Sequence, residues 1–251
     1  DAATLYAARA AIDVFRHTPE GSDQAPRIRL RASIGVGDLH HFEIGGHKDE
    51  WHALLAGDAI NDVASADADG EPDRVTASGA AWSLIRERCT SSQLLSGCVR
   101  LLSVDAEIGP PTELPSPGGL ASDRLRANVP PMILDRLDVG IPVSQAGAFR
   151  TISSVFIAVG GVRPSDPDAL SRLHSALLAI QQISDRFGGC VHQTRTDEKG
   201  TIVILAFGLP PNHHENDATR AVRAAVSFEA TLKLLGLPCS IGVASGPVFC
   251  S

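Results

Sequence analysis

Three polar residues stand close together in residues 57–64 and are the first candidates for chemistry. Asp58, Asn61 and Asp62 fall near the start of a helix predicted over residues 58–66. The Asn61 amide can bind a ligand, or it can simply cap the helix. Asp58 and Asp62, four residues apart, stand where carboxylates favour the positive end of the helix dipole whatever their function. Both roles of Asn61 stay open.

Histidines and acidic residues elsewhere offer possible metal ligands. His40, His41, His47 and His52 fall on one predicted hairpin. Strand alternation puts the first two on opposite faces and no cysteine is near, which argues against a zinc site. Residues 197–198, Asp-Glu, are acidic, but a hairpin turn alone explains their presence. The sequence therefore predicts no metal site.

Composition excludes several classes of function. The 251 residues include 29 acidic and 22 basic side chains, a net charge of −7. This balance argues against nucleic-acid binding, since no basic patch exists to displace counterions from phosphates. Apolar runs such as residues 202–207 are far shorter than the ~20 residues that a membrane span needs. Five cysteines without a CxxC pair indicate a reducing, cytoplasmic compartment.

An internal repeat is the most informative feature of the chain. Residues 7–12 (Ala-Ala-Arg-Ala-Ala-Ile) resemble residues 221–226 (Ala-Val-Arg-Ala-Ala-Val), and Ser-Ile-Gly-Val recurs at residues 33–36 and 240–243. A helix precedes a strand in both copies. The material after the first copy is missing after the second, so we expect the chain to begin inside one domain and to stop inside a related one, as a fragment of a longer polypeptide.

Periodicity predicts the elements of both copies. The first copy has a helix over residues 2–16, a strand over 28–36, strands at 39–44 and 51–56, and two further helices. The second copy has a strand at 151–159, a helix with an apolar stripe at 170–183, a hairpin at 191–207, a helix at 215–235 and a strand from 240. Its order, β-α-β-β-α-β, is that of a ferredoxin-like unit in an α/β (α+β) protein.

Proline content indicates the boundary between the two expected domains. Residues 106–131 hold six prolines and two adjacent glycines, a composition typical of a linker. We expect a first domain over residues 1–105, a linker over 106–145 and a second domain over 146–251.

Five segments carry a resemblance to a known family. They are residues 28–36 (Ile-Arg-Leu-Arg-Ala-Ser-Ile-Gly-Val), 57–64 (Gly-Asp-Ala-Ile-Asn-Asp-Val-Ala), 150–156, 198–210 and 240–250. Their order is similar to that of the class III nucleotide cyclases, and most similar to the tandem-domain, bicarbonate-responsive soluble adenylyl cyclases. The resemblance implies two incomplete cyclase modules that form a pseudo-twofold pair: the back half of a first catalytic domain and the front half of a second.

The resemblance also implies a mechanism. ATP lies between two domains, and two carboxylates of one domain hold two Mg²⁺ ions that activate the ribose 3′ hydroxyl. An Asn of the other domain orients the ribose, and an Arg stabilises charge at the α-phosphate. Cyclic AMP and pyrophosphate are the products.

Residue by residue, this chain departs from the family pattern. Ala158 and Thr201 occupy the two metal-ligand positions, so the Mg²⁺ ligands of the intact enzyme should lie outside this chain. Asn61 and Gly57 match the nucleotide-binding segment, with Asn61 at the transition-state position. Three further positions carry substitutions: Leu54 for the adenine-reading Asp, Ser65 for the Arg, and Ala64 for a bicarbonate-binding Arg.

The resulting expectation is the central part of a tandem adenylate cyclase, itself inactive. Its partners would be ATP, the missing halves of its own domains and bicarbonate. The alternative is a catalytically dead pseudocyclase that senses a nucleotide or an anion. A third possibility is an unrelated ferredoxin-like interaction domain that binds no nucleotide.

Overall fold

The protein folds as a mixed α+β chain of two compact units. The computed structural model describes residues 2–17, 29–94, 96–105, 126, 129, 131–140, 148–197 and 200–250. The first unit comprises Asp1–Leu39 and Gly57–Ser116, and the second comprises His40–Ala56 and Pro117–Ser251. The predicted fold class is confirmed, and each unit is described separately below.

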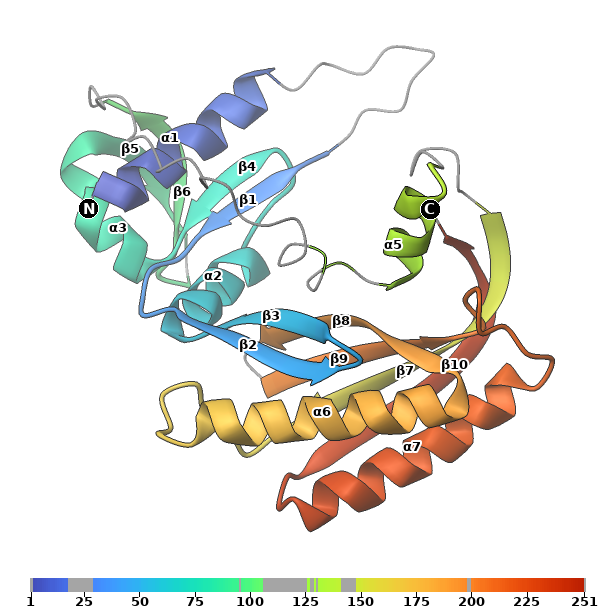
Figure 1. Cartoon of the computed structure of the whole chain (residues 1–251). Helices are drawn as coiled ribbons and strands as arrows, with labels where there is room; N and C mark the ends of the chain where they lie inside the picture. Colours follow the sequence, from blue (N-terminus) through green and yellow to red (C-terminus); the bar gives the residue numbers. More distant parts are fainter. Residues whose placement is uncertain are drawn as a thin grey trace. The chain divides into compact units, whose positions relative to one another are not determined.

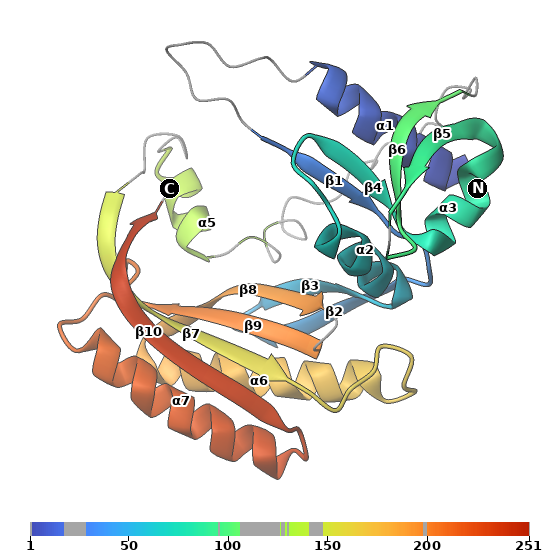
Figure 2. The ribbon, with the colours of Figure 1, turned by 180° about the vertical axis from the view of Figure 1, so that it is seen from behind.

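The first unit is built on a four-stranded sheet with the order β1-β4-β6-β5 (Figures 1 and 2). Strands β1 and β4 are parallel, whereas β6 is antiparallel to both of its neighbours. Its elements are α1 (Ala2–His17), β1 (Arg31–Ile34), α2 (Asp58–Ala68), β4 (Arg74–Ala77), α3 (Gly79–Ile85), a 3₁₀ turn (Arg86–Arg88), β5 (Cys89–Gln93) and β6 (Val99–Val104).

Alternation along β1 separates the two faces of this sheet. Ile34 is buried in a cluster with Leu5, Ala8 and Ile12 of α1, the apolar stripe that predicts this helix from sequence. On the other face, the Ser33 hydroxyl donates to Asp67 of α2 over 3.2 Å. Helix α1 therefore covers one face of the sheet and α2 covers the other.

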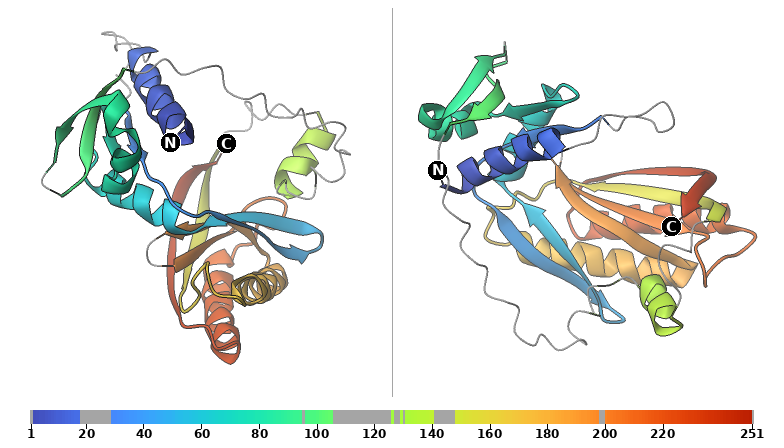
Figure 3. Two further views of the ribbon diagram at one scale, coloured as in Figure 1. Left: turned by 90° about the vertical axis from the view of Figure 1, so that its left-hand side faces the viewer. Right: turned by 90° about the horizontal axis from the view of Figure 1, so that it is seen from above.

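The second unit is a four-stranded antiparallel sheet with the order β10-β7-β9-β8. Counted from β7, this is the order 4-1-3-2. Helices α6 and α7 cover one face of the sheet (Figures 1 and 3). The elements are β7 (Ala148–Val159), α6 (Ala169–Phe187), β8 (Gly189–Asp197), β9 (Gly200–Phe207), α7 (Asp217–Leu234) and β10 (Cys239–Cys250). The predicted β-α-β-β-α-β order is present.

Apolar spacing explains why α6 packs on this sheet. Leu173, Leu177 and Ile180, three or four residues apart, are all buried and share one helix face. They contact a core that includes Val155 and Phe207. The helix ends at Gly188, whose φ of 77° gives the left-handed cap expected of a glycine.

A hairpin, β2 (His40–His47) and β3 (Glu50–Ala56), belongs to the second unit. Ile44 and Leu54 are buried in the core of that unit, with exposed fractions of 1% and 0%. The side-chain amide of Gln181, on α6, bonds to the hairpin through both of its polar atoms. Its oxygen accepts from the His47 N–H over 3.2 Å, and its nitrogen donates to the Glu50 carbonyl over 2.9 Å. The sequence groups residues 40–56 with the first domain, but burial of their apolar side chains groups them with the second unit.

Other predicted elements differ in extent. The strand expected over 28–36 is paired only at Arg31–Ile34; residue 28 lies outside the described residues. Most of the linker at 106–145 also lies outside them, as do residues 198 and 199 of the predicted turn. Within that linker range the structure describes helix α5 (Pro131–Asp138). None of the described helices combines the length and the apolar character that a bilayer span requires.

Candidate functional site

Gly57 and Asn61 lie at the start of α2, in the first unit. Gly57 is the N-cap residue with a φ of 136°, and a Cβ there would collide with the Asp38 carbonyl oxygen. Its own carbonyl accepts from the N–H groups of Ile60 and Asn61 over 3.1 and 3.4 Å. Asn61 is the fourth residue of the helix and is exposed. Asn61 is therefore not the cap, and its amide faces solvent.

Asn61 and Ser65 are one turn apart on α2, and both are exposed. Residues at this spacing share a helix face. The two positions that the resemblance assigns to the transition state therefore lie together on the surface of the first unit. Of these two positions, only 61 carries the side chain that the resemblance implies; position 65 is a serine, which brings no positive charge.

The neighbouring carboxylate of Asp62 has a structural role instead. It accepts from the Val36 N–H over 2.8 Å and from the Ser78 hydroxyl over 2.5 Å. Ser78 is buried and its hydroxyl also accepts from the Ala81 N–H over 3.0 Å, which caps α3. Asp62 thus joins α2 to the end of β1 and to the start of α3, with both bonds made to its Oδ2 atom.

The two metal positions of the family pattern fall at the same end of adjacent strands in the second unit. Ala158 of β7 lies opposite Ile202 of β9, and Thr201 lies opposite Val159. A methyl group and a buried hydroxyl, placed on alternate faces of the sheet, do not make the oxygen-ligand set of Mg²⁺. The residues present do not fit a pair of Mg²⁺ ions.

Two histidines of the hairpin lie against carboxylates. His47 and Lys48 both contact Asp185, at 3.2 and 2.6 Å, and His52 lies 3.0 Å from Glu50. The hydrogen bond from Lys48, with a smaller contribution from that of His47, holds the pKa of Asp185 below its usual value. Across the described parts of the chain, no three His, Cys, Asp or Glu side chains gather as metal ligands.

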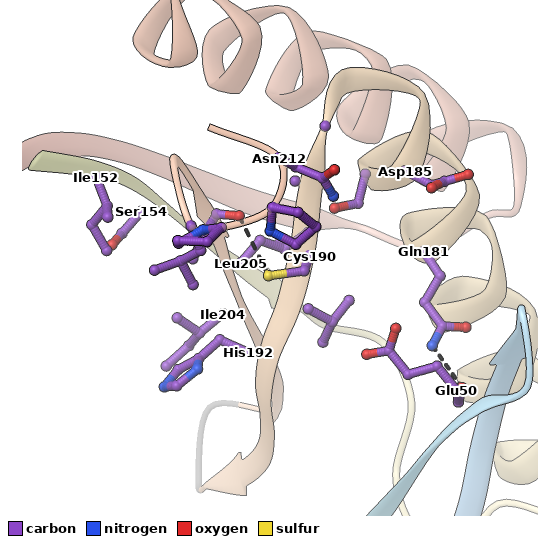
Figure 4. A pocket seen from close by; sticks show the side chains of 18 of the residues that line it. Glu50, Ile152, Ser154, Gln181, Asp185, Cys190, His192, Ile204, Leu205 and Asn212 are labelled. Atoms are coloured by element: carbon purple, nitrogen blue, oxygen red, sulfur yellow. Dashed lines mark hydrogen bonds between the residues drawn. The ribbon is translucent and has the colours of Figure 1, made fainter. Parts of the chain in front are cut away.

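Sequence patterns missed a cavity of about 690 Å³ in the second unit (Figure 4). The hairpin, α6, β8 and the loop at 209–212 contribute to its wall. Cys190 lies in the middle of the view, between Ile152 and Ser154 on one side and Gln181 and Asp185 on the other. No sequence motif marks this cavity, because its residues come from separate segments that only folding assembles.

Burial of the Cys190 thiol raises its pKa to about 11, with a further increase from the negative charge of Glu50. The folded protein therefore holds the thiol neutral, whereas the unfolded chain releases its proton nearer pH 9. Below pH 9 this difference in pKa stabilises the folded state, and the stabilisation is lost as the pH rises through 11. A shift of this size corresponds to about 2–3 kcal/mol.

We expect the unfolding free energy of the wild-type chain to fall by roughly 2 kcal/mol more than that of Cys190→Ala between pH 8.5 and pH 11. Urea titrations at a series of pH values, followed by circular dichroism, measure the difference. Other groups that titrate in this range are common to both proteins. If the unfolding free energies of the two proteins change equally with pH, the result would contradict a buried, neutral Cys190 thiol.

Comparison with known proteins gives only distant similarity. No family model matches the sequence, and no curated protein matches it. Several solved structures are similar to part of the chain. The catalytic core of a rhodopsin-guanylyl cyclase with converted specificity, in complex with ATPαS, is 21% identical over 42% of this chain and 61% of its own, with a TM-score of 0.37.

Two further structures are guanylyl cyclases as well. The guanylyl cyclase Cya2 is 19% identical over 41% of this chain, with a TM-score of 0.35, and 57% of its own chain is covered. The guanylate cyclase domain of RhGC from Catenaria anguillulae, in complex with GTP, is 22% identical over 40% of this chain, with a TM-score of 0.35 and 59% of its own chain covered. The chain thus spans about three fifths of the length of these structures.

Proposed function

We propose that the intact protein is a class III nucleotide cyclase that converts ATP to cyclic AMP and pyrophosphate. The observation that supports this most is the placement of four assigned positions. Ala158 and Thr201 lie at one end of adjacent strands, and Asn61 and Ser65 share an exposed helix face. This is the division into a carboxylate side and an Asn/Arg side that the resemblance requires of two cooperating domains.

The chain itself supplies few of the side chains that the proposed reaction needs. Asn61 offers an amide that can hydrogen-bond a ribose, but Ser65 offers no charge for the α-phosphate. Ala158 and Thr201 provide no carboxylate for metal ions. We therefore propose that the competent site uses residues outside this chain and that the residues supplied here belong to a degenerate site. Regulation by bicarbonate is part of the same proposal, although Ala64 stands where the bicarbonate-binding arginine is expected.

The missing halves of both domains are the proposed partners of this chain. In the first unit, a Cβ on Gly35 would collide with the backbone of Val63, so α2 packs directly on this glycine. Gly242 is its counterpart in the repeat, and apart from its chain neighbours no described atom lies within 4 Å of its Cβ position. We propose that a helix equivalent to α2 covers Gly242 in the intact protein.

We place the intact protein in the cytoplasm. All five cysteines are free thiols, which fits a reducing compartment. Fractionation of cells that express the intact protein, followed by immunoblotting, tests this placement.

A cyclase assay tests the main proposal. We expect the 251-residue chain to form neither cyclic AMP nor cyclic GMP from ATP or GTP with Mg²⁺ or Mn²⁺, because it lacks the metal carboxylates and the arginine. The intact protein in the same assay is the control and should form cyclic AMP. Product from the chain alone would contradict the roles assigned to positions 158, 201 and 65.

A second candidate function is a catalytically inactive pseudocyclase that senses a nucleotide or an anion. Ala158, Thr201 and Ser65 favour it, because they lack the carboxylates and the guanidinium that the resemblance assigns to turnover at these positions. If the intact protein forms no cyclic nucleotide, with or without bicarbonate, the cyclase proposal fails. Equilibrium dialysis with ATP and with bicarbonate then tests whether the intact protein still binds them.

A further inference from the structure

The cavity of the second unit has the size and the lining of a ligand site. Its volume, about 690 Å³, falls within the range of roughly 300–1,000 Å³ that small-molecule sites occupy. Its wall is largely apolar, with contributions from Ile152, Ile204, Leu205 and Val248. Apolar walls with a few polar groups are typical of sites that enclose a small molecule.

One polar group in this wall has no partner. The Ser184 hydroxyl belongs to a residue that is 1% exposed, and among the described residues it has no hydrogen-bond partner. Ser184 lines the cavity, but its hydroxyl is covered, so the side chain must turn toward the cavity to reach a ligand. A buried hydroxyl without a partner costs free energy that a ligand with an acceptor group can recover. The serine therefore indicates where a polar group of a ligand would be held.

Charge around the cavity disfavours an anion. The Lys48 ammonium is already paired with Asp185 over 2.6 Å, and Glu50 adds a second carboxylate to the lining. Lys48 is the only lysine or arginine among the described lining residues, so no unpaired side chain of these two types is offered to a phosphate or carboxylate group. Cys190 contributes a neutral thiol, whose Sγ lies 3.7 Å from the Ala206 carbonyl oxygen.

We propose that this cavity binds an uncharged, mainly apolar small molecule whose carbonyl group accepts a hydrogen bond from the Ser184 hydroxyl. The site includes residues of the hairpin as well as of α6, β8 and β9, so a bound molecule would stabilise the docked hairpin. It is distinct from the nucleotide positions of the proposed function: Ala158, Thr201 and Asn61 do not line it. The proposal stands whether or not the intact protein is a cyclase.

Nile red is a suitable probe, because it is uncharged, aromatic and carries a ring carbonyl. We expect its fluorescence to rise on titration with the 251-residue chain and to saturate at one molecule per chain. Bound dye should also slow alkylation of Cys190 by iodoacetamide at least about fivefold, since the thiol lies in the cavity wall. The anionic dye anilinonaphthalene sulfonate should bind at least about tenfold more weakly.

Two variants test the location of the site. Ser154→Phe fills the cavity from β7 and should weaken Nile red binding by at least about tenfold. Ile202→Phe is the matched control on the same open face of the sheet, outside the cavity, and should change binding by less than about twofold. Ser184→Ala should weaken binding by roughly fivefold, the effect of one lost hydrogen bond.

The Ser184→Ala variant also distinguishes a loss of binding from a loss of stability. Its melting temperature should equal or exceed that of the wild type, because the substitution removes an unpartnered buried hydroxyl. Failure of the dye to saturate overturns the proposal, and so does saturable binding that Ser184→Ala leaves unchanged. A larger effect from Ile202→Phe than from Ser154→Phe would place the dye on the open sheet face and overturn it as well. If Ser154→Phe does not fold, Ser184→Ala and Cys190 protection decide the outcome.

Discussion

Replacing Leu54 with aspartate should destabilise the second unit by about 4 kcal/mol, through lost apolar burial and a carboxylate placed in the core. Leu54 is fully buried and packs in one cluster with Ile44 of the hairpin and Val155 of β7. The cluster around it is apolar, so the new carboxylate would lose its hydration on burial. Leu54→Asp should therefore release the hairpin from α6 and β8.

The adjacent residue supplies the control. Leu55 is 47% exposed, because alternation turns its side chain away from the core. Leu55→Asp should change the unfolding free energy by less than about 0.5 kcal/mol. Trp51, which stacks on His174 of α6 at 6.0 Å, reports hairpin docking by fluorescence, with both variants built in a Trp82→Phe background. Equal urea midpoints for the two variants would contradict the buried position of Leu54.

This result bears on function as well as on stability. The resemblance places an adenine-reading aspartate at position 54 in relatives. In this chain that position is a core position of a docked hairpin, so restoring the family residue is expected to disrupt the fold rather than to create a base-reading group.

Gly35→Ala should cost the first unit about 1–3 kcal/mol, the usual range for atoms forced into a packed site. The added Cβ would collide with the Val63 backbone nitrogen and would lie 2.7 Å from the Val63 Cα and 2.8 Å from the Asp62 carbonyl carbon. These are backbone atoms of α2, which cannot rotate away as a side chain can. Relief requires a shift of the whole helix, and Asp62 ties that helix to Val36 and Ser78.

Gly242→Ala is the matched control from the second copy of the repeat. Its Cβ position is open in this chain, so the change in unfolding free energy should be within about 0.5 kcal/mol. Urea titrations followed by circular dichroism measure both variants. If the proposed helix packs on Gly242 in the intact protein, the same substitution should be as costly there as Gly35→Ala is here. Equal costs of the two substitutions in this chain would contradict the difference in environment.

Most helices and strands were predictable from the periodicity of apolar side chains. The stripe from Leu170 to Ile183 predicts α6, and its buried members confirm the face that packs on the sheet. The order of elements in the second unit and the paired strands of the hairpin were also predictable. The reason is local: a repeat of 3.6 or of 2 residues in apolar side chains is enough to favour a helix or a strand.

Candidate site residues were harder to interpret, because one residue type serves several roles. Asn61 was a possible cap, but Gly57 occupies the N-cap position and leaves Asn61 exposed in the helix. Asp62 was interpreted through the helix dipole alone, whereas its carboxylate also bonds Val36 and Ser78. Neither partner could be identified from spacing, since each lies at least sixteen residues away along the chain.

Sequence patterns were sufficient for the fold class and for most helices and strands, since these depend on residue type and neighbours along the chain. Only folding shows that the hairpin packs in the second unit, that Gly35 is covered while Gly242 is open, and that Ser184 lines a cavity without a partner. These features depend on contacts between distant segments, and burial, which decides their energies, is a property of the packed chain.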